Sequence, residues 1–421
     1  MKSLLSIALS ISLLIILSLI DQETQAVPSF ARKYKTSCTT CHYAFPKLNA
    51  FGKAFKNNGY RYPAGQDLEM TKEEPVNLGA DAYKKVWPNA IWPTNIAGTA
   101  PFSAQAIGRI HFDNSVNDEK SAYFEIPHEF ELFFAGTFDN KISYFGEVEL
   151  EHASELAYEF SVNYDFNPGF HLKLGSVGLQ HATPEHHRLT AEHYDVVDLK
   201  TQSGAWRLRN GAGAGVELWG AGNGSGGKGG FTYAVGVGNG QNDDDNFDLN
   251  KKKDYYGRVT YKIGGLGEIG GTTGQASEES AFYLDNSLRF GGFVYSGTAI
   301  SGGENDKFSV IGGDIDWWFN RFNMTAVALQ MKSDYMGTER TSLAYFIEGN
   351  YVIYPWLIAR ARYEYDDPDT NDDINEAAKN ILPGMVVLVR SNVKFSLEYL
   401  KPLDDPRKAN DKFTFQFNFA F

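Results

Sequence analysis

The feature that most constrains the fold is a strict two-residue alternation at the end of the chain. Phe413, Phe415, Phe417, Phe419 and Phe421 alternate with Thr414, Gln416, Asn418 and Ala420. Because successive side chains of a β-strand point to opposite faces, one face of this segment is aromatic and the other is polar or small. A soluble β-sandwich could bury the aromatic face, and lipid could also cover it.

Other segments repeat this alternation with charged residues on the second face. Leu357, Ala359, Ala361, Tyr363 and Tyr365 alternate with Ile358, Arg360, Arg362 and Glu364; Gly146, Val148 and Leu150 with Glu147, Glu149 and Glu151; and Val259 and Tyr261 with Arg258, Thr260 and Lys262. Such segments, separated by turn residues, are typical of a transmembrane β-barrel. The sequence therefore predicts an all-β chain with an antiparallel barrel of about sixteen strands over residues 99–421.

The predicted strands begin near residues 99, 122, 139, 154, 168, 205, 229, 253, 281, 306, 321, 340, 355, 380, 391 and 410. If both ends of the barrel face the periplasm, short turns alternate with long loops. We expect short turns at 139–140, 168–169 and 354–355. Longer connections are expected at 114–121, 179–204, 219–228, 242–251, 264–280, 299–306, 334–340 and 366–378.

Composition agrees with this fold class and excludes others. The chain has 30 Phe, 23 Tyr and 42 Gly against 22% charged residues, a mixture that favours β-structure. A mean hydropathy of −0.35 argues against a bundle of membrane helices. A net charge of −13 argues against nucleic acid as a partner, because phosphate binding requires clustered Lys and Arg.

Residues 1–26 are predicted to be a secretory signal peptide. Lys2 supplies the positive start, 4–20 is an apolar run, and cleavage is expected after Ala26. An uncleaved anchor helix is the alternative, and either one takes the chain out of the cytoplasm.

Both cysteines of the chain lie in one short motif, Cys38-Thr39-Thr40-Cys41-His42. C-x-x-C-H is the attachment signature of haem c, in which the two thiols bind the porphyrin and the histidine binds the iron. A thioredoxin-type redox pair would not need the histidine. A zinc site would need two further ligands at matched spacing. We therefore predict one covalent haem c on Cys38 and Cys41, with His42 as an axial ligand.

Residues 27–80 are predicted to be the haem segment, and 81–98 a connector to the barrel. The run 44–59 is predicted to be one short helix that Gly59 ends. Four apolar side chains of this run are expected to pack on the haem: Phe45, Leu48, Phe51 and Phe55. A segment this short buries too little surface to fold alone, so we expect the haem and a barrel wall to complete it.

The second axial ligand is open. Met70 is the methionine nearest the motif in the following sequence. The connection at 179–204 carries four histidines and could fold into the barrel, which makes His186 and His187 the other candidates. The alternative for Met70 is a loop methionine that does not bind iron. The alternative for the histidines is a polar loop that does not bind iron.

Charged side chains on the polar faces must point into the lumen, because lipid exposure would be too costly. Representative predicted lumen residues are Glu147, Glu149, Arg360 and Arg362. Ion pairs that stabilise the barrel are one interpretation. A polar path for ions, or a docking surface for the haem segment, is the other.

The N-terminal motif resembles that of a known family. The shared pattern comprises Phe30-Ala31-Arg32, Ser37 to His42, Phe45-Pro46-Lys47-Leu48, Phe51-Gly52, and Phe55-Lys56 followed by Gly59-Tyr60. It resembles the fused monohaem cytochrome–porins of the bacterial outer membrane, the type known from iron-oxidising bacteria. The resemblance implies one haem c lodged in or capping the barrel, which carries electrons across the outer membrane.

The resemblance also implies partners. Periplasmic c-type cytochromes or other redox proteins would accept the electrons, and an extracellular donor, with Fe(II) as the candidate, would supply them. The second functional hypothesis is a passive outer-membrane porin for anions or small solutes with a haem-bearing plug. A third is a haem enzyme acting on a small molecule such as peroxide, for which no distal motif is visible. No catalytic residue is assigned.

Overall fold

The computed structural model describes residues 29–74, 76–77, 95–96, 98, 100–113, 122–138, 140–151, 155–178, 189–241, 248, 250–270, 285–371, 377–404 and 410–421. The expected signal peptide at 1–26 lies outside these residues, as does most of the expected connector at 81–98. Within the described ranges, no helix is both long and apolar enough to cross a membrane.

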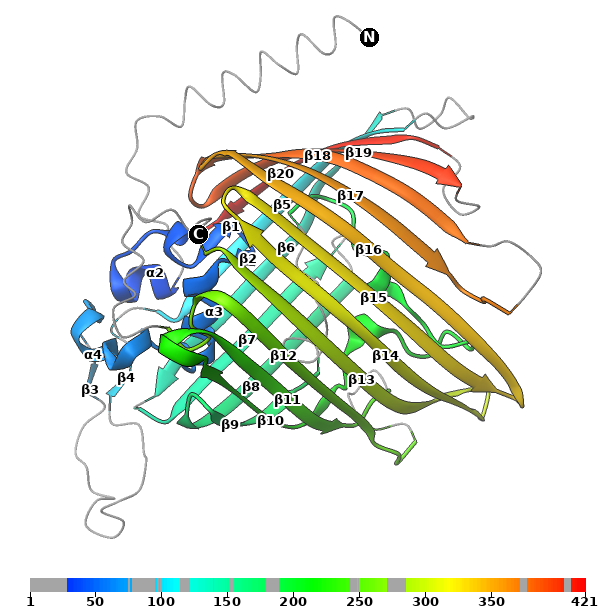
Figure 1. The fold of residues 1–421 in the computed structure, drawn as a ribbon, viewed down its shortest axis with the longest axis horizontal. Coiled ribbons are helices and arrows are strands. Elements are labelled where there is room, and N and C mark those ends of the chain that lie inside the picture. The colour runs from blue at the N-terminus through cyan, green and yellow to red at the C-terminus, as the bar shows by residue number, and fades with distance from the viewer. Residues whose placement is uncertain are drawn as a thin grey trace, which may run out of the picture.

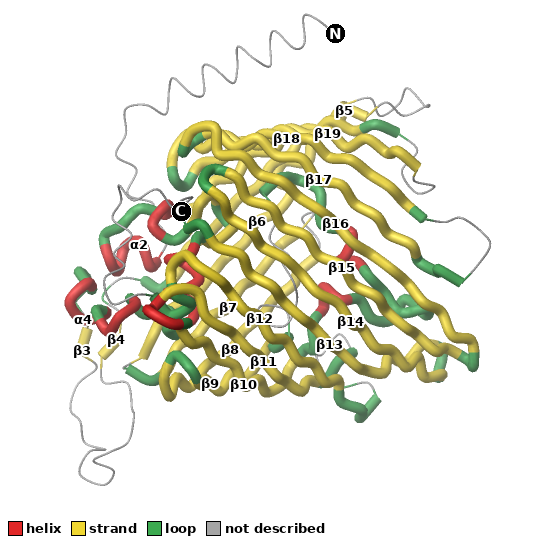
Figure 2. Tube along the Cα trace, viewed as in Figure 1, coloured by secondary structure: helices red, strands yellow, loops and turns green. Residues whose placement is uncertain are grey.

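Sixteen antiparallel strands close into a barrel, which confirms the predicted all-β barrel of about sixteen strands (Figures 1 and 2). The strands are β5 (Phe102–Asp113), β6 (Ala122–Phe138), β7 (Ile142–Glu151), β8 (Glu155–Asn167), β9 (Phe170–Ser176), β10 (Ala214–Asn223), β11 (Lys228–Gly238), β12 (Asp254–Leu266), β13 (Ser287–Ser301), β14 (Glu304–Phe319), β15 (Phe322–Tyr335), β16 (Thr338–Tyr354), β17 (Leu357–Asp367), β18 (Ala378–Arg390), β19 (Val393–Asp404) and β20 (Lys412–Ala420). Each pairs with its neighbour in sequence. β20 closes the barrel on β5, where Ala420 lies opposite Gln105.

The alternation that predicted the strands also fixes which face is inside. In β20, Thr414, Gln416 and Asn418 are buried in the lumen, whereas Phe413 on the opposite face is exposed. Since a closed barrel leaves no unpaired strand edge, every backbone group of β20 has a partner strand on one side or the other.

Several connections expected to be long are tight turns. β13 and β14 are joined by Gly302 and Gly303, both with positive φ (60° and 87°), as a two-residue hairpin turn requires. β15 and β16 are joined by 336–337, and β10 extends to Asn223, with only 224–227 before β11. The expected loops at 299–306, 334–340 and 219–228 are therefore wrong, because their glycines form the turns and the flanking residues continue the strands.

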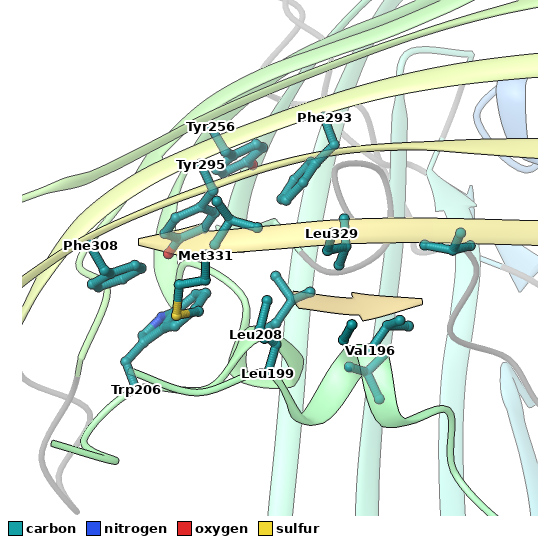
Figure 3. Packing of buried hydrophobic residues seen from close by; sticks show 14 of the residues in the cluster. Val196, Leu199, Trp206, Leu208, Tyr256, Phe293, Tyr295, Phe308, Leu329 and Met331 are labelled. Atoms are coloured by element: carbon teal, nitrogen blue, oxygen red, sulfur yellow. The ribbon is translucent and has the colours of Figure 1, made fainter. Parts of the chain in front are cut away.

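Part of the inner wall is apolar rather than polar. Three inward-pointing side chains show this: Phe293 of β13, and Leu329 and Met331 of β15. The connection between β9 and β10 covers them (Figure 3). This connection contains the short turns η5 (Asp195–Asp198) and η6 (Leu208–Asn210). The ring centroid of its buried Trp206 lies 4.3 Å from that of Phe308 on β14. The part of this loop that is described, from residue 189, thus folds into the lumen.

The N-terminal segment lies at the barrel mouth where β20 ends (Figure 1). We call this end the C-terminal mouth; the turns at 168–169, 355–356 and 391–392 form its rim. The elements of the segment are α2 (Ser29–Tyr34), η1 (Cys38–Thr40), β1 (His42–Ala44), β2 (Lys47–Leu48), α3 (Ala50–Asn57), η2 (Pro63–Gly65) and α4 (Asp67–Met70), followed by the pair β3 (Val76–Asn77) and β4 (Asn95–Ile96).

The expected helix over 44–59 is wrong in its first half. β1 and β2 form a small hairpin with Phe45 and Pro46 in its turn, and helix α3 begins only at Ala50. Asn49 explains the boundary, because its side chain accepts a hydrogen bond from Gly52 N at 2.9 Å and so caps the helix. Gly59, with φ of +66°, follows the C-terminus as expected.

Candidate functional site

The C-x-x-C-H motif forms a compact loop held by the cap of the next helix. Cys38 begins the turn η1, and Cys41 N donates to Cys38 O at 3.2 Å. Asn49, the capping residue of α3, donates from its amide nitrogen to Thr39 O (3.1 Å) and Thr40 O (3.0 Å). One side chain therefore fixes both the start of the helix and the backbone between the two cysteines.

Helix α3 packs against this loop at a glycine. A Cβ placed on Gly52 would lie 2.1 Å from Cys41 O and 2.9 Å from the Leu48 side chain. These distances are far inside van der Waals contact, so only glycine allows the helix and the loop to approach this closely.

His42 begins the β1–β2 hairpin, and the turn of this hairpin orients its ring. Its Nδ1 lies 3.0 Å from Pro46 O, and a carbonyl can only accept, so Nδ1 carries the proton. In this neutral tautomer the ring lone pair is on Nε2. Burial lowers the pKa of His42 to about 4, so the ring is neutral at physiological pH. A neutral imidazole with its other nitrogen bonded to a carbonyl fits an axial ligand of haem iron.

The two cysteines are free thiols in the structure. Burial raises the pKa of Cys41 to about 12 and also raises that of Cys38. A redox-active C-x-x-C pair needs a lowered thiol pKa and a place at the start of a helix. The opposite shift disfavours that interpretation and is compatible with two thiols that are to be alkylated.

Behind the loop lies a cluster of aromatic side chains: Tyr34, Phe51, Phe55 and Tyr62, with Phe30, Tyr60 and Met70 packed around it. Cys41 contacts the same cluster. Met70, at the end of α4, is half-buried there, so the structure brings this candidate ligand to the core that supports the motif.

The other predicted contacts of the haem are more scattered. The Phe45 ring centroid lies 5.3 Å from that of His42. Leu48 lies at the end of β2 and lines a small cavity with Lys53, Trp318 and other side chains. His186 and His187 lie outside the described residues, and the nearby His193 contributes its carbonyl to Arg362 at 3.0 Å.

Ion pairs of Lys47, Lys53 and Arg61 tie the segment to the barrel wall. Lys47 Nζ lies 2.9 Å from Glu348 Oε1, with side chains 3% and 0% exposed. Lys53 pairs with Asp316 at 2.7 Å on β14. Arg61 pairs with Asp165 at 2.6 Å on β8 and also donates to Ile142 O. Because these carboxylates lie on strands around the barrel, the segment is held from several sides.

The hairpin turn between β18 and β19 contacts the motif directly. The Cys38 thiol hydrogen-bonds the side chain of Ser391. Lys394, at the start of β19, donates to Phe45 O at 2.8 Å and is 3% exposed. His42 and this lysine thus bond to two successive carbonyls of the β1–β2 turn.

Of the predicted lumen residues, the two arginines take part in a dense ion-pair network. Arg360 lies 3.2 Å from Glu348 and 2.8 Å from Glu398. Arg362 lies 3.2 Å from Glu364 and donates to carbonyls of the inward loop. The same Glu348 that binds Lys47 therefore also binds the barrel arginine.

The acidic side of the lumen is on β6 to β8. Glu149 lies opposite Glu131 across β7 and β6, and Glu147 lies opposite Glu159 on β8. Among the residues that the structure describes, no group of three His, Cys, Asp or Glu side chains is arranged to hold a metal ion.

The residues that sequence reasoning missed are those that act across long separations. Lys47 and Glu348 are 301 residues apart, and Lys394 is 349 residues from Phe45. Nothing local in the sequence pairs them. Asn49 could have been found, because an asparagine directly before a run of apolar residues at helical spacing is a helix-start signal.

No family model and no curated protein matches the chain. Among solved structures it is similar to the anion-selective porin from Comamonas acidovorans, with 14% identity, a TM-score of 0.52, and coverage of 76% of this chain and 98% of that one. It is also similar to OmpT, an outer membrane protein of Vibrio cholerae, with 12% identity, a TM-score of 0.53, and coverage of 77% and 99%. The chain therefore has the fold of outer-membrane porins.

Proposed function

We propose that this chain is an outer-membrane electron-transfer protein with one haem c, bound covalently by Cys38 and Cys41 and ligated by His42. It carries electrons between an extracellular donor, with Fe(II) as the candidate, and periplasmic c-type cytochromes or other redox proteins. The proposal joins it to the fused monohaem cytochrome–porins that its N-terminal motif resembles.

One observation carries the proposal. The C-x-x-C-H loop is docked at the mouth of a porin-type barrel, with His42 Nδ1 bonded to Pro46 O at 3.0 Å. Haem c, when bound, supplies one-electron redox chemistry. A lone attachment motif on a soluble segment would support only a periplasmic carrier, whereas its docking on a barrel supports transfer across the membrane.

The chain's own residues support this role in distinct ways. Asn49 and Gly52 hold the attachment loop on α3, and Pro46 O sets the tautomer of His42. Lys47 and Lys53 fix the segment on the barrel, so the redox group would keep one place relative to both sides of the membrane. The inward loop and the segment together narrow the lumen, which favours electrons over solutes as the cargo.

The fold itself supports a second function. A neighbour named as an anion-selective porin has a similar fold, and Arg360 and Arg362 supply cationic side chains inside the barrel of this chain. A passive porin for anions or small solutes, with the N-terminal segment as its plug, is therefore the alternative.

The deciding experiment uses full-length protein, produced with a haem c maturation system and inserted in liposomes that enclose an oxidised c-type cytochrome. Fe(II) is added outside, and reduction of the enclosed cytochrome is followed by its absorbance. We expect a covalent haem band on denaturing gels and reduction of the enclosed cytochrome. The control variant Cys38→Ala/Cys41→Ala should keep the barrel and lose both signals.

The outcomes separate the two functions. A haem-free chain with stable ionic conductance in planar bilayers would replace electron transfer by the porin function. Covalent haem that other donors reduce, but Fe(II) does not, would retain electron transfer and remove Fe(II) as the donor. Met70→Ala, with the spectrum of the reduced haem as the measurement, tests the candidate second ligand.

A further inference from the structure

The N-terminal segment and the inward loop meet on one carboxylate of the barrel. The inward loop is here residues 189–213 of the connection between β9 and β10. Glu348 of β16 is fully buried, and its Oε1 lies 2.9 Å from Lys47 Nζ of the segment. Its Oε2 accepts a hydrogen bond from the Tyr194 hydroxyl of the loop at 3.0 Å. One barrel side chain therefore binds the segment through one oxygen and the loop through the other.

The two elements also contact each other and share an apolar cluster. Lys47 Nζ lies 5.5 Å from the ring centroid of Tyr194, within the range of a cation–π contact. Tyr43 and Ala44 of the segment lie in the same buried cluster as Leu189 of the loop, which is 0% exposed. Withdrawal of the segment would therefore remove a neighbour of Tyr194 and part of the cluster that buries Leu189.

The segment and the loop fill the barrel in series. The segment lies at the C-terminal mouth (Figure 1). From Glu348 the loop continues toward the opposite mouth, where Ser203 N donates to Asp306 at 2.8 Å, close to the β13–β14 turn at 302–303. A solute that crosses the lumen therefore has to pass beside both elements. Further bonds hold the loop to three other strands: Asp195 N to Glu364 on β17, Gln202 N to Ser333 on β15, and Arg109 on β5 to Ala191 O.

We propose that the segment and the inward loop form one gate. Docking of the segment holds the loop in place, and release of the segment loosens the loop, so that small ions cross the lumen more readily. The coupling is reciprocal, because a contact between two elements stabilises each of them by the same free energy. The inference goes beyond electron transfer and does not require the haem.

The first test is hydrogen exchange of the full-length protein, produced with the haem c maturation system and held in detergent micelles. Lys47→Met removes the cation that contacts both Glu348 and the Tyr194 ring. Leu189→Ala shortens a loop side chain of the shared cluster and leaves every segment residue in place. One variant therefore perturbs the contact from the segment, and the other perturbs it from the loop.

The control variants lie in the same two elements. Lys53→Met removes another cation of the segment, whose ion pair with Asp316 joins the segment to β14. Arg209→Ala removes a loop cation whose partner, Asp198, lies in the loop itself. Both pairs are partly exposed, and exposed pairs contribute little, so each control should change exchange by less than about fivefold. Amides of β14 to β18 report on the barrel in the same samples.

We expect the coupling to appear in both directions. Lys47→Met should accelerate exchange of the loop amides about tenfold, together with that of the segment. Leu189→Ala should accelerate exchange of the β1 and β2 amides about tenfold. These factors lie inside the range of about 5- to 150-fold that couplings between sites span. If Lys47→Met does not accumulate, Leu189→Ala gives the reciprocal comparison.

The second test is the ionic conductance of the same variants in planar bilayers. We expect the unchanged chain to be closed most of the time, because the segment and the loop are both docked. Lys47→Met should open about ten times as often, in step with the change in exchange. Lys53→Met and Arg209→Ala should remain close to the unchanged chain.

Two results would overturn the inference. Faster exchange in the segment of Lys47→Met, with the loop as protected as before, would show that the two elements dock independently. Faster exchange in both elements without more frequent opening would show that they are coupled but do not gate the lumen. Either result would leave the proposed electron transfer standing, since covalent haem and reduction by Fe(II) are measured separately.

Discussion

The buried ion pair between Lys47 and Glu348 predicts how firmly the N-terminal segment is docked. Lys47→Met removes the cation and keeps most of the side-chain volume. Glu348 then retains Arg360 at 3.2 Å and the Tyr194 hydroxyl at 3.0 Å. The variant therefore removes one of several partners of a buried carboxylate.

The size of the effect follows from those remaining partners. Breaking a buried ion pair so that one charge is left alone costs about 3–5 kcal/mol. Loss of a single charge-assisted hydrogen bond costs about 1.5–3 kcal/mol. Because Arg360 still compensates the charge of Glu348, we expect Lys47→Met to cost about 1.5–3 kcal/mol. At about 1.4 kcal/mol per factor of ten, this lowers the docking equilibrium constant by a factor of roughly 10 to 150. Lys53→Met should cost less, about 0–1 kcal/mol, because its ion pair is partly exposed.

Hydrogen exchange of the folded protein in detergent micelles measures this free energy. Amides of β1, β2 and α3 report docking of the segment, and amides of β14 to β18 report the barrel in the same sample. Lys47→Met should accelerate exchange in the segment and leave the barrel strands as they were. Glu348→Gln and the double variant complete a cycle that isolates the coupling between the two side chains.

Equal exchange in Lys47→Met and the unchanged chain would refute the reasoning, because the ion pair would then contribute nothing to docking. A coupling energy near zero in this cycle, with docking weakened in both single variants, would also refute the reasoning. The two side chains would then act through other contacts and not through each other.

Three further predictions concern the attachment motif. Gly52→Ala should sharply lower the yield of haem-loaded protein on haem-stained gels, since its Cβ would meet Cys41 O at 2.1 Å, while a barrel of normal heat modifiability would still form. Asn49→Ala should destabilise helix α3 and the attachment loop by about 1–2 kcal/mol, seen as faster proteolysis of the segment, because it loses both the helix cap and the bonds to Thr39 O and Thr40 O; Asn49→Asp should keep the cap and lose only the bonds to these two carbonyls. In haem-free protein, the pKa of His42 falls from 6.5 to about 4 on docking, so the undocked segment binds the proton more tightly. Docking should therefore weaken as pH falls from about 6.5 toward 4, and His42→Gln should abolish this part of the pH dependence.

The barrel could be predicted from the sequence because its signal is local. Alternation with period two decides the face of each residue, and β20 and β17 follow it without exception at the positions quoted above. The boundaries at glycines could not be predicted equally well. Gly302 and Gly303 have the composition of a loop, but two positive φ values in succession make them a hairpin turn.

The candidate site could be predicted only as a motif. The two thiols and His42 lie within five residues, so the haem c prediction follows from their spacing alone. The helix expected over 44–59 was wrong because Asn49 and the Phe45–Pro46 turn outweigh an apolar stripe that continues past the true start of α3. Barrel residues such as Lys394 became evident only when the closed strands placed them beside the motif.

The contacts of Glu348 also impose an order of events on the making of this protein. The segment that carries Cys38 and Cys41 precedes its anchor by about 300 residues, and that anchor is inside a barrel that exists only after β20 has met β5. Docking is therefore a late step. Until then both thiols lie on a segment that lacks its barrel anchor, so we expect the proposed attachment of haem to precede docking.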